Sequence, residues 1–145
     1  MTSGIVRIKK SGIVPAPIES VWSVLGSYNG MTKWHSGVKD SIIEDNLPDN
    51  QIGIVRRLTL ESGGFVRERL LAMDAVNFKI TYNMEEGLPV KGYVATTSLY
   101  PITESNQTLF EWKAEFECDD VEKWTTVVGE GVFVTGINSM KKVAF

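Results

Sequence analysis

Two residues of opposite charge, Arg56 and Glu68, occur in predicted strands at positions where the pattern otherwise places apolar side chains. Side chains at every second residue of a strand point to the same face of the sheet. Arg56 therefore shares a face with aliphatic residues of the predicted strand 52–60, and Glu68 does so in the predicted strand 65–73. These aliphatic residues are Ile52, Ile54, Leu58 and Leu60 in the first strand, and Val66, Leu70 and Ala72 in the second. We therefore expect both charged groups on the inner face of the sheet.

The turn between these two strands decides whether the charges meet. A three-residue loop from Glu61 to Gly63 places Arg56 directly opposite Glu68 in an antiparallel hairpin. Hairpin loops of this length commonly need a glycine in the left-handed conformation, and this turn contains two adjacent glycines. The sequence therefore predicts an ion pair on the inner face, on condition that this loop forms.

An inward ion pair has a structural interpretation and a chemical one. In the structural interpretation, Arg56 and Glu68 neutralise each other and fix the register, although desolvation of both ions offsets most of their attraction. In the chemical interpretation, Glu68 accepts or delivers a proton and Arg56 binds an oxyanion, a carboxylate or an enolate. The sequence leaves both interpretations open.

Further polar and aromatic side chains are candidates for the wall of a binding site. Each of them could be an ordinary core residue, but together they could hydrogen-bond a polar group of an apolar ligand. His35, which lies in a turn, is predicted to be a surface residue near the mouth of a ligand cavity, and a gating or acid–base role is the alternative. The complete set of candidates is Tyr82, Tyr93, Thr97, Trp112, Trp124, Trp34 and His35, in addition to Arg56 and Glu68.

The strands that carry these residues are recognised by alternation with period two. Six of them follow one another with short connections, and short connections favour an antiparallel meander. One further strand precedes two short helical segments near the N-terminus. The seven predicted strands are 5–10, 38–45, 52–60, 65–73, 77–84, 92–100 and 109–117.

Helices are predicted near both ends of the chain. Two prolines at 15–17 suit a first helical turn, and apolar residues at helical spacing follow over 18–25. A second short helical turn holds Met31 and Trp34. A long helix runs from Val121 to Val143 after an aspartate N-cap. Its glycines each cost about 1 kcal/mol of helix stability relative to alanine, so we expect a kink or a break near 129–131.

Composition narrows the function further. The 145 residues suit one domain, 1–145, and the net charge of −3 argues against nucleic-acid binding. A single cysteine excludes an intrachain disulfide, and one cysteine and one histidine far apart in the sequence argue against a His/Cys zinc site. The sequence contains no phosphate loop and no serine elbow that would indicate a cofactor or a hydrolase. Without an apolar stretch for a signal or a membrane span, we expect a cytoplasmic monomer or homodimer without membrane insertion.

The predicted architecture is an α+β domain in which a curved sheet of seven antiparallel strands surrounds the long C-terminal helix. The apolar face of the sheet must be covered, and the final helix is the only long element available for this. A curved sheet around one helix leaves a concave gap, where small ligands bind. We therefore expect a cavity for a small, mostly apolar ligand.

The sequence resembles the START-type helix-grip (SRPBCC) superfamily, which includes polyketide cyclase/dehydrase-like proteins. The resemblance covers nearly the whole chain and depends on the order of several loose segments, namely APIESVWSVLGSYNGMTKW, GIVRRLTL, VRERLLAMD, ITYNM and FEWKAEF. It implies a helix-grip fold. It also implies that a lipid, sterol, polyketide or other hydrophobic molecule binds between the sheet and the long helix.

Within this superfamily, the chain is similar to the branch that includes the plant lachrymatory-factor synthase. That enzyme uses an arginine in a Gly-x-x-Arg strand and a glutamate in a Glu-x-Leu strand, which correspond here to Arg56 and Glu68. The resemblance leaves three functions open. They are a ligand-binding protein, a cyclase, isomerase or dehydratase with Glu68 as general acid/base and Arg56 as anion stabiliser, and a non-catalytic partner-binding module.

Overall fold

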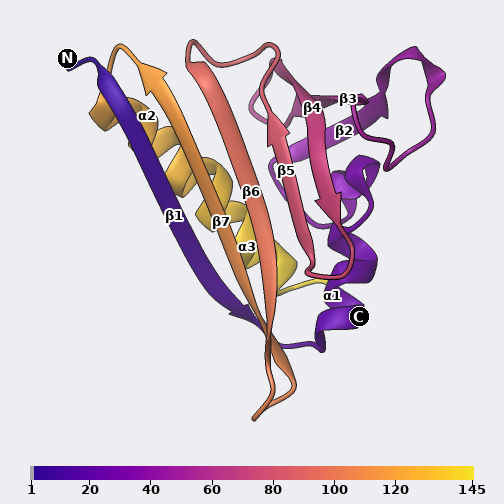
Figure 1. The fold of residues 1–145 in the computed structure, drawn as a ribbon. Coiled ribbons are helices and arrows are strands. Elements are labelled where there is room, and N and C mark those ends of the chain that lie inside the picture. Colours follow the sequence, from indigo (N-terminus) through magenta and orange to yellow (C-terminus); the bar gives the residue numbers. More distant parts are fainter. Residues whose placement is uncertain (1) are drawn as a thin grey trace.

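The computed structural model describes residues 2–145 and has the expected element order (Figure 1). A first strand is followed by short helices, then by six strands, and then by a C-terminal helix. The strands are β1 (Gly4–Val14), β2 (Val38–Ile43), β3 (Val55–Leu60), β4 (Phe65–Asp74), β5 (Lys79–Asn83), β6 (Lys91–Ile102) and β7 (Gln107–Cys118). The helices are α1 (Ile18–Leu25), η1 (Tyr28–Lys33), η2 (Glu44–Asn46), α2 (Val121–Thr126), η3 (Val127–Val134) and α3 (Thr135–Met140).

All seven strands form one antiparallel sheet in the order β1-β7-β6-β5-β4-β3-β2. The predicted meander of six strands is confirmed, and β1 pairs with the last strand along its whole length, from Gly4–Cys118 to Val14–Thr108. Register shifts interrupt the β4–β5 and β6–β7 ladders. Such irregularities bend a strand and increase its twist, which suits a sheet that curves around a helix.

Two predicted strands begin later than the alternation suggested. The predicted strand 52–60 begins at Val55, because Gly53 has φ of 97° and residues 52–53 form a turn that leaves Ile52 57% exposed. The predicted strand 77–84 begins at Lys79, because Phe78 adopts φ of 58°. The alternation of apolar and polar residues does not predict these local left-handed backbone conformations, which end the pairing of a strand with its neighbour.

The C-terminal helix runs through α2, η3 and α3 without a break. Its N-cap is Asp120, as predicted, and the carboxylate of Asp120 accepts a hydrogen bond from the backbone N–H of Lys123 at 3.2 Å. Of the kink or break expected near 129–131, the break does not occur. Instead, the central segment η3 is a π-helix, a form that occurs mostly as short insertions in α-helices.

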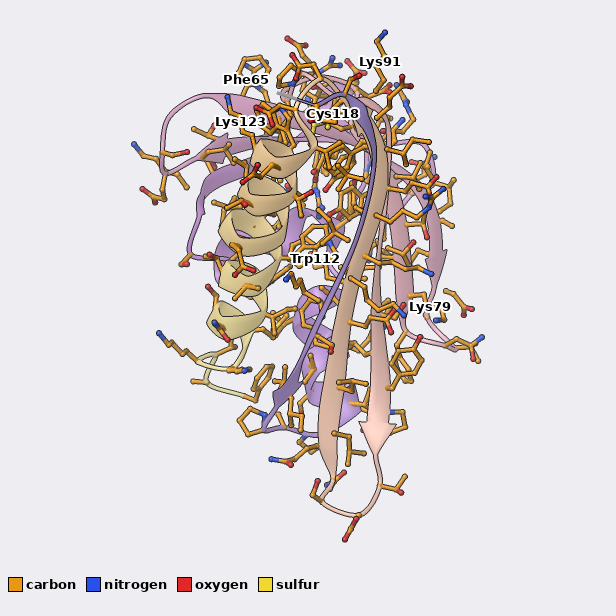
Figure 2. All side chains as sticks on the ribbon, turned by 90° about the vertical axis from the view of Figure 1, so that its left-hand side faces the viewer. Phe65, Lys79, Lys91, Trp112, Cys118 and Lys123 are labelled. Atoms are coloured by element: carbon orange, nitrogen blue, oxygen red, sulfur yellow. The ribbon has the colours of Figure 1, made fainter. Side chains whose placement is uncertain are left out.

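The core lies between the inner face of the sheet and the C-terminal helix, and Trp112 of β7 stands near its centre (Figure 2). The ring of Trp112 stacks on Phe133 of η3, with centroids 4.5 Å apart. Gly136 lets the helix approach closely, because an added Cβ would lie 2.6 Å from Trp112 and 2.5 Å from His35. In the described residues 2–145, no helix has both the length and the apolarity needed to cross a membrane.

Candidate functional site

Arg56 of β3 and Glu68 of β4 form the predicted ion pair on the inner face of the sheet. They are directly opposite each other in the β3–β4 ladder and are only 6% and 5% exposed. Nε of Arg56 donates a hydrogen bond to Oε1 of Glu68 at 2.9 Å, and Nη2 lies 2.9 Å from the same oxygen. Both contacts therefore use one carboxylate oxygen.

The β3–β4 turn produces this register. The backbone N–H of Gly63 donates to the carbonyl of Leu60 at 3.0 Å, and the N–H of Leu60 donates to the carbonyl of Gly64 at 3.1 Å. Gly63 and Gly64 have φ of 94° and 81°, a region that favours glycine. The condition on which the sequence prediction depended is thus met, and the two charges meet.

Tyr28 of η1 completes the surroundings of the pair. The guanidinium carbon of Arg56 lies 4.0 Å from the centre of the Tyr28 ring and 4.9 Å from that of Tyr82. Nη1 of Arg56 donates to the backbone carbonyl of Tyr28 at 2.9 Å, and the Tyr28 hydroxyl donates to the backbone carbonyl of Glu68 at 2.9 Å. Arg56 is thus held by an ion pair, a backbone hydrogen bond and two cation–π contacts.

Sequence reasoning missed Tyr28 as a site residue. In the sequence it belongs to a Tyr-Asn-Gly cluster that ends a helix, and this signal concerns only local structure. Its contact with Arg56 depends on how η1 docks against β3 and β4, which lie far from it along the chain. A fully buried tyrosine with a polar hydroxyl needs a partner, but its sequence position does not say which.

Burial controls the protonation of this site. It raises the pKa of Glu68 above the ordinary value of 4.5, and the neighbouring Arg56 opposes this rise by charge and by hydrogen bonding. Burial also raises the pKa values of Tyr28, Tyr82 and Tyr93, so all three hydroxyls are neutral at pH 7. The site therefore combines a cation with a carboxyl group that takes up a proton more readily than an exposed one.

Polar groups continue from the ion pair across the inner face of the sheet. The indole N–H of Trp112 donates to the Tyr82 hydroxyl at 3.0 Å, and the rings of Tyr82 and Tyr93 lie 6.4 Å apart. Thr97, opposite Trp112 in the β6–β7 ladder, is 3% exposed, and its hydroxyl has no hydrogen-bond partner in residues 2–145. We use the name polar cluster for Tyr28, Arg56, Glu68, Tyr82 and Trp112.

His35 is not the surface residue that the sequence suggested. It is 4% exposed, its Nε2–H donates to the carbonyl of Val132 at 2.8 Å, and its Nδ1 accepts from the N–H of Gly37 at 3.0 Å. Burial lowers its pKa below 6.5, so the ring is neutral at pH 7. The prediction failed because a turn residue was assumed to face water, whereas this turn packs under the C-terminal helix.

The two remaining tryptophan candidates have different surroundings. Trp34 is buried, and its ring lies 5.7 Å from Trp112 and 5.8 Å from Phe110. Trp124 lies in α2 beneath the ammonium group of Lys123, at 4.8 Å. Within residues 2–145, Trp124 makes neither a hydrogen bond nor a ring contact with the polar cluster. The structure thus connects Trp34 to the site, but not Trp124.

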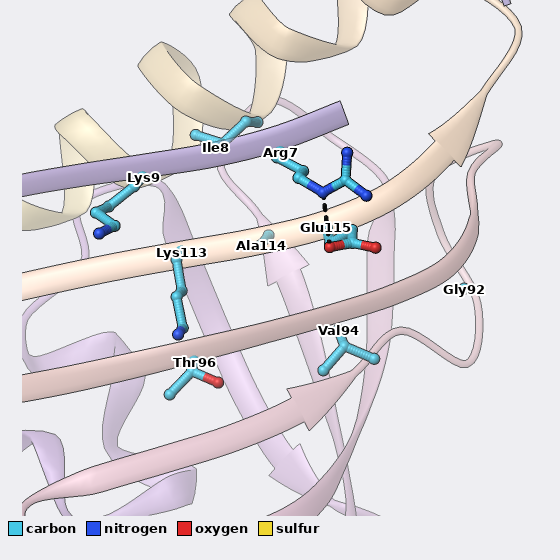
Figure 3. Close-up of a pocket in the computed structure, with 9 residues that line it drawn as sticks. All are labelled: Arg7, Ile8, Lys9, Gly92, Val94, Thr96, Lys113, Ala114 and Glu115. Carbon is cyan, nitrogen blue, oxygen red and sulfur yellow. Dashed lines mark hydrogen bonds and ion pairs between the residues drawn. The ribbon is translucent and has the colours of Figure 1, made fainter. Parts of the chain in front are cut away.

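Hollows in the surface of residues 2–145 include three that are lined by neither Arg56 nor Glu68. One of about 450 Å³ lies on the outer face of β1, β6 and β7, where Arg7 pairs with Glu115 at 3.1 Å (Figure 3). One of about 350 Å³ is lined by residues such as Ser3 and Pro89, and one of about 290 Å³ lies between η1 and α3. Side chains such as Phe133 fill space between sheet and helix, and the internal cavity stays a prediction. No group of three potential metal-binding side chains was found in residues 2–145.

Comparison with known proteins identifies one family model. It is described as "Polyketide cyclase / dehydrase and lipid transport" and matches residues 6–144. The chain also resembles three solved proteins, XoxI from Bacillus cereus, one from Nitrosospira multiformis and one from Thermobifida fusca. Sequence identities are 23%, 22% and 24%, TM-scores are 0.83, 0.82 and 0.83, and the alignments cover 94% of this chain and 94%, 94% and 91% of theirs. At these identities the likeness shows the fold alone. Comparison with curated proteins finds no match, so the similarity to lachrymatory-factor synthase stays a prediction.

Proposed function

Because the chain belongs to the polyketide cyclase/dehydrase and lipid transport family, we propose that it binds a small, mostly apolar organic molecule between sheet and C-terminal helix. Arg56 and Glu68 hold the polar end of this molecule. The observation that carries the proposal is an ion pair, 6% and 5% exposed, in an otherwise mostly apolar interior. Apolar residues of similar volume can often replace such a pair without loss of stability. A role in recognition is therefore a better reason for the pair than stability.

The chemistry of Arg56 suits an oxygen-bearing group. A guanidinium is planar and always charged, and it presents several N–H donors that match a carboxylate, an enolate or a carbonyl oxygen. The rings of Tyr28 and Tyr82 hold it in place, so little side-chain entropy is lost when a ligand binds. The ligand takes the space that aromatic side chains such as Phe133 occupy here, so binding includes movement of these side chains.

A second candidate function is an enzyme of the cyclase, isomerase or dehydratase kind. The raised pKa of Glu68 favours it, because a general acid/base works best with a pKa near the working pH. Both Arg56 contacts use Oε1, so Oε2 would be the oxygen that exchanges a proton with the substrate. Glu68→Gln is then expected to reduce turnover by about 10²–10⁴-fold while binding is retained.

A third candidate is a non-catalytic partner-binding module in which the pair only fixes the register. The low exposure of the pair and the filled interior favour this candidate. It predicts that apolar small molecules neither bind nor react, and that Arg56 can be replaced without any change in ligand response.

Screening of apolar carboxylic acids and phenols by thermal shift and native mass spectrometry separates these functions. The wild type is compared with Arg56→Met/Glu68→Leu, in which both charges are removed together, and with Arg57→Ala. Arg57 is the matched control, because it is the neighbouring arginine on β3 but is exposed and packs on Phe65 at 3.9 Å. We expect ligand response in the wild type and in Arg57→Ala only. An equal response from all three proteins to every ligand would count against the anchor role.

A further inference from the structure

The hollow between η1 and α3 borders two buried aromatic residues, Trp34 and His35, which we call its wall. It measures about 290 Å³ and is lined by two segments, one from Thr32 to Ser36 and the other from Ser139 to Val143. Trp34 and His35 line it although they are only 5% and 4% exposed. Both residues therefore border the hollow, and both of their rings contact the core.

Behind this wall lie the groups of the polar cluster. The ring centres of Trp34 and His35 lie 5.7 Å and 5.9 Å from that of Trp112. The indole N–H of Trp112 in turn binds the Tyr82 hydroxyl, and the Tyr82 ring contacts Arg56. A continuous series of contacts thus leads from the hollow to the buried guanidinium.

Few polar contacts close this wall. The N–H of Ser36 donates to Oγ of Ser139 at 3.2 Å, and the two serine hydroxyls lie 2.9 Å apart. The third contact joins Nε2 of His35 to the carbonyl of Val132 in the π-helix η3. A hydrogen bond of this kind contributes only about 1 kcal/mol net, because water can replace either partner when the wall opens. Gly136 contributes no side chain to this wall, and the ring of His35 packs closely on its backbone.

The charges at the two ends of this route have the same sign. Lys33 and Lys142 line the hollow and are exposed, and neither has a salt bridge within residues 2–145. At the inner end, Arg56 carries a third positive charge, which is paired with Glu68 in the ligand-free protein. Two lysines at the mouth of a hollow in a protein of net charge −3 produce a local positive potential, which raises the association rate of anions.

We infer that this hollow is the entrance to the ligand site, that Trp34 and His35 form its gate, and that the ligand is an apolar molecule with one acidic group. The inference rests on the proposed function, and it adds the route and the charge of the ligand. The acidic group passes the two lysines first and ends at Arg56. The apolar part replaces the contacts that Trp34 and Trp112 make in the closed state.

Two fluorescent probes of the same skeleton test both parts of the inference. 8-Anilinonaphthalene-1-sulfonate is an apolar anion, and N-phenyl-1-naphthylamine is its neutral counterpart. In Ser36→Cys/Ser139→Cys, the separation of the two serine oxygens suits a disulfide that locks the gate. We expect the oxidised form to bind both probes about tenfold or more slowly than the wild type in stopped-flow measurements, and reductant to restore the rate. Equal rates in the locked and reduced forms would overturn the entrance.

The charge requirement is tested separately in Lys33→Glu/Lys142→Glu. We expect the anionic probe to associate about tenfold more slowly at low salt, and the neutral probe to be unaffected. Lys9→Glu/Lys113→Glu, two lysines that pair across β1 and β7 on the outer face, is the matched control and should leave both rates unchanged. An equal effect of both double variants on the anionic probe would refute steering at this entrance.

A labelling experiment tests the gate without any ligand. Thr97→Cys is prepared in a Cys118→Ser background, so the only thiol is buried and lies beside Trp112 on the neighbouring strand. Its reaction with the aromatic anion 5,5′-dithiobis(2-nitrobenzoate) is compared with the rate of global unfolding. We expect Trp34→Ala to accelerate labelling about tenfold or more beyond any change in its rate of global unfolding. Trp124→Ala should cause no such acceleration. If neither probe binds the wild type, the proposed function fails, whereas labelling that only follows global unfolding overturns the gate.

Discussion

Removal of one charge from the Arg56–Glu68 pair should destabilise the protein far more than removal of both. Arg56→Met keeps most of the apolar stem between Tyr28 and Tyr82 but leaves Glu68 buried without a counterion. Breaking such a pair costs about 3–5 kcal/mol, because the remaining charge is neither solvated nor paired. In Arg56→Met/Glu68→Leu, this cost disappears, and stability should return to within about 1 kcal/mol of the wild type or exceed it.

Urea denaturation at pH 7 measures both effects. With a slope of about 2 kcal/mol per M, the single variant should lose about 2 M in its unfolding midpoint, and the double variant should recover most of this. The matched control is Arg57→Met, whose exposed side chain should cost less than about 1 kcal/mol. A single variant within about 1 kcal/mol of the wild type would refute the reasoning, since it would mean that Glu68 is solvated or protonated at pH 7.

The pH dependence gives the same prediction an independent check. Because burial raises the pKa of Glu68 in the folded state above 4.5, the folded state takes up a proton at a higher pH than the unfolded chain. Stability from this protonation is therefore fully present below pH 4.5 and is lost as the pH rises through the folded pKa. Without Arg56, the folded pKa rises further. The cost of Arg56→Met should thus shrink as the pH falls from 7 toward 4.5, and the double variant should lack this trend.

Three further predictions concern single positions. Gly136→Ala should lower the free energy of unfolding by about 1–3 kcal/mol in urea titrations, because its Cβ would overlap His35; Gly131→Ala, whose Cβ meets no described atom within 4 Å, should be neutral or stabilising. Thr97→Val should raise the melting temperature of the ligand-free protein by about 2–4 °C, since an unpartnered buried hydroxyl costs about 1 kcal/mol or more, and a decrease would show that the hydroxyl has a partner. Because burial lowers the pKa of His35, stability from its neutral ring is present above pH 6.5 and is lost as the pH falls through the folded pKa. The melting temperature should therefore fall more steeply below pH 6.5 in the wild type than in His35→Gln, and parallel curves would contradict this.

The ion pair could be predicted from the sequence because local rules determine it. Alternation places Arg56 and Glu68 on one face, and a turn with two adjacent glycines sets the register that makes them neighbours. Both rules act over a few residues, so no knowledge of the remaining fold was needed. The same is true of Asp120, where an N-cap depends only on the turn that follows it.

The surroundings of the pair could not be predicted in this way, because they depend on docking between distant segments. Tyr28 and His35 both lie in turns, where sequence patterns favour exposure, yet both are buried beneath other elements. The glycines of the C-terminal helix suggested a kink or a break, since helix propensity considers the helix in isolation. In the folded protein, Gly136 instead lets the helix lie against Trp112 and His35.

The energetics of the interior bear on the choice between a structural role and a ligand-binding role. An interior selected for stability alone would not need a carboxylate whose charge is costly to bury, nor a threonine hydroxyl without a partner. Glu68 and Thr97 lie on two different strands of the same inner face, and Tyr82, on the strand between them, accepts a hydrogen bond from Trp112 on the other neighbour of the Thr97 strand. A bound molecule that donates a hydrogen bond to the Glu68 carboxylate and forms another with the Thr97 hydroxyl would remove both costs together. The loss of ligand-induced stabilisation in Glu68→Gln/Thr97→Val should therefore be smaller than the sum of the losses in the two single variants, and simple additivity in this thermal-shift cycle would argue that the two groups serve separate purposes.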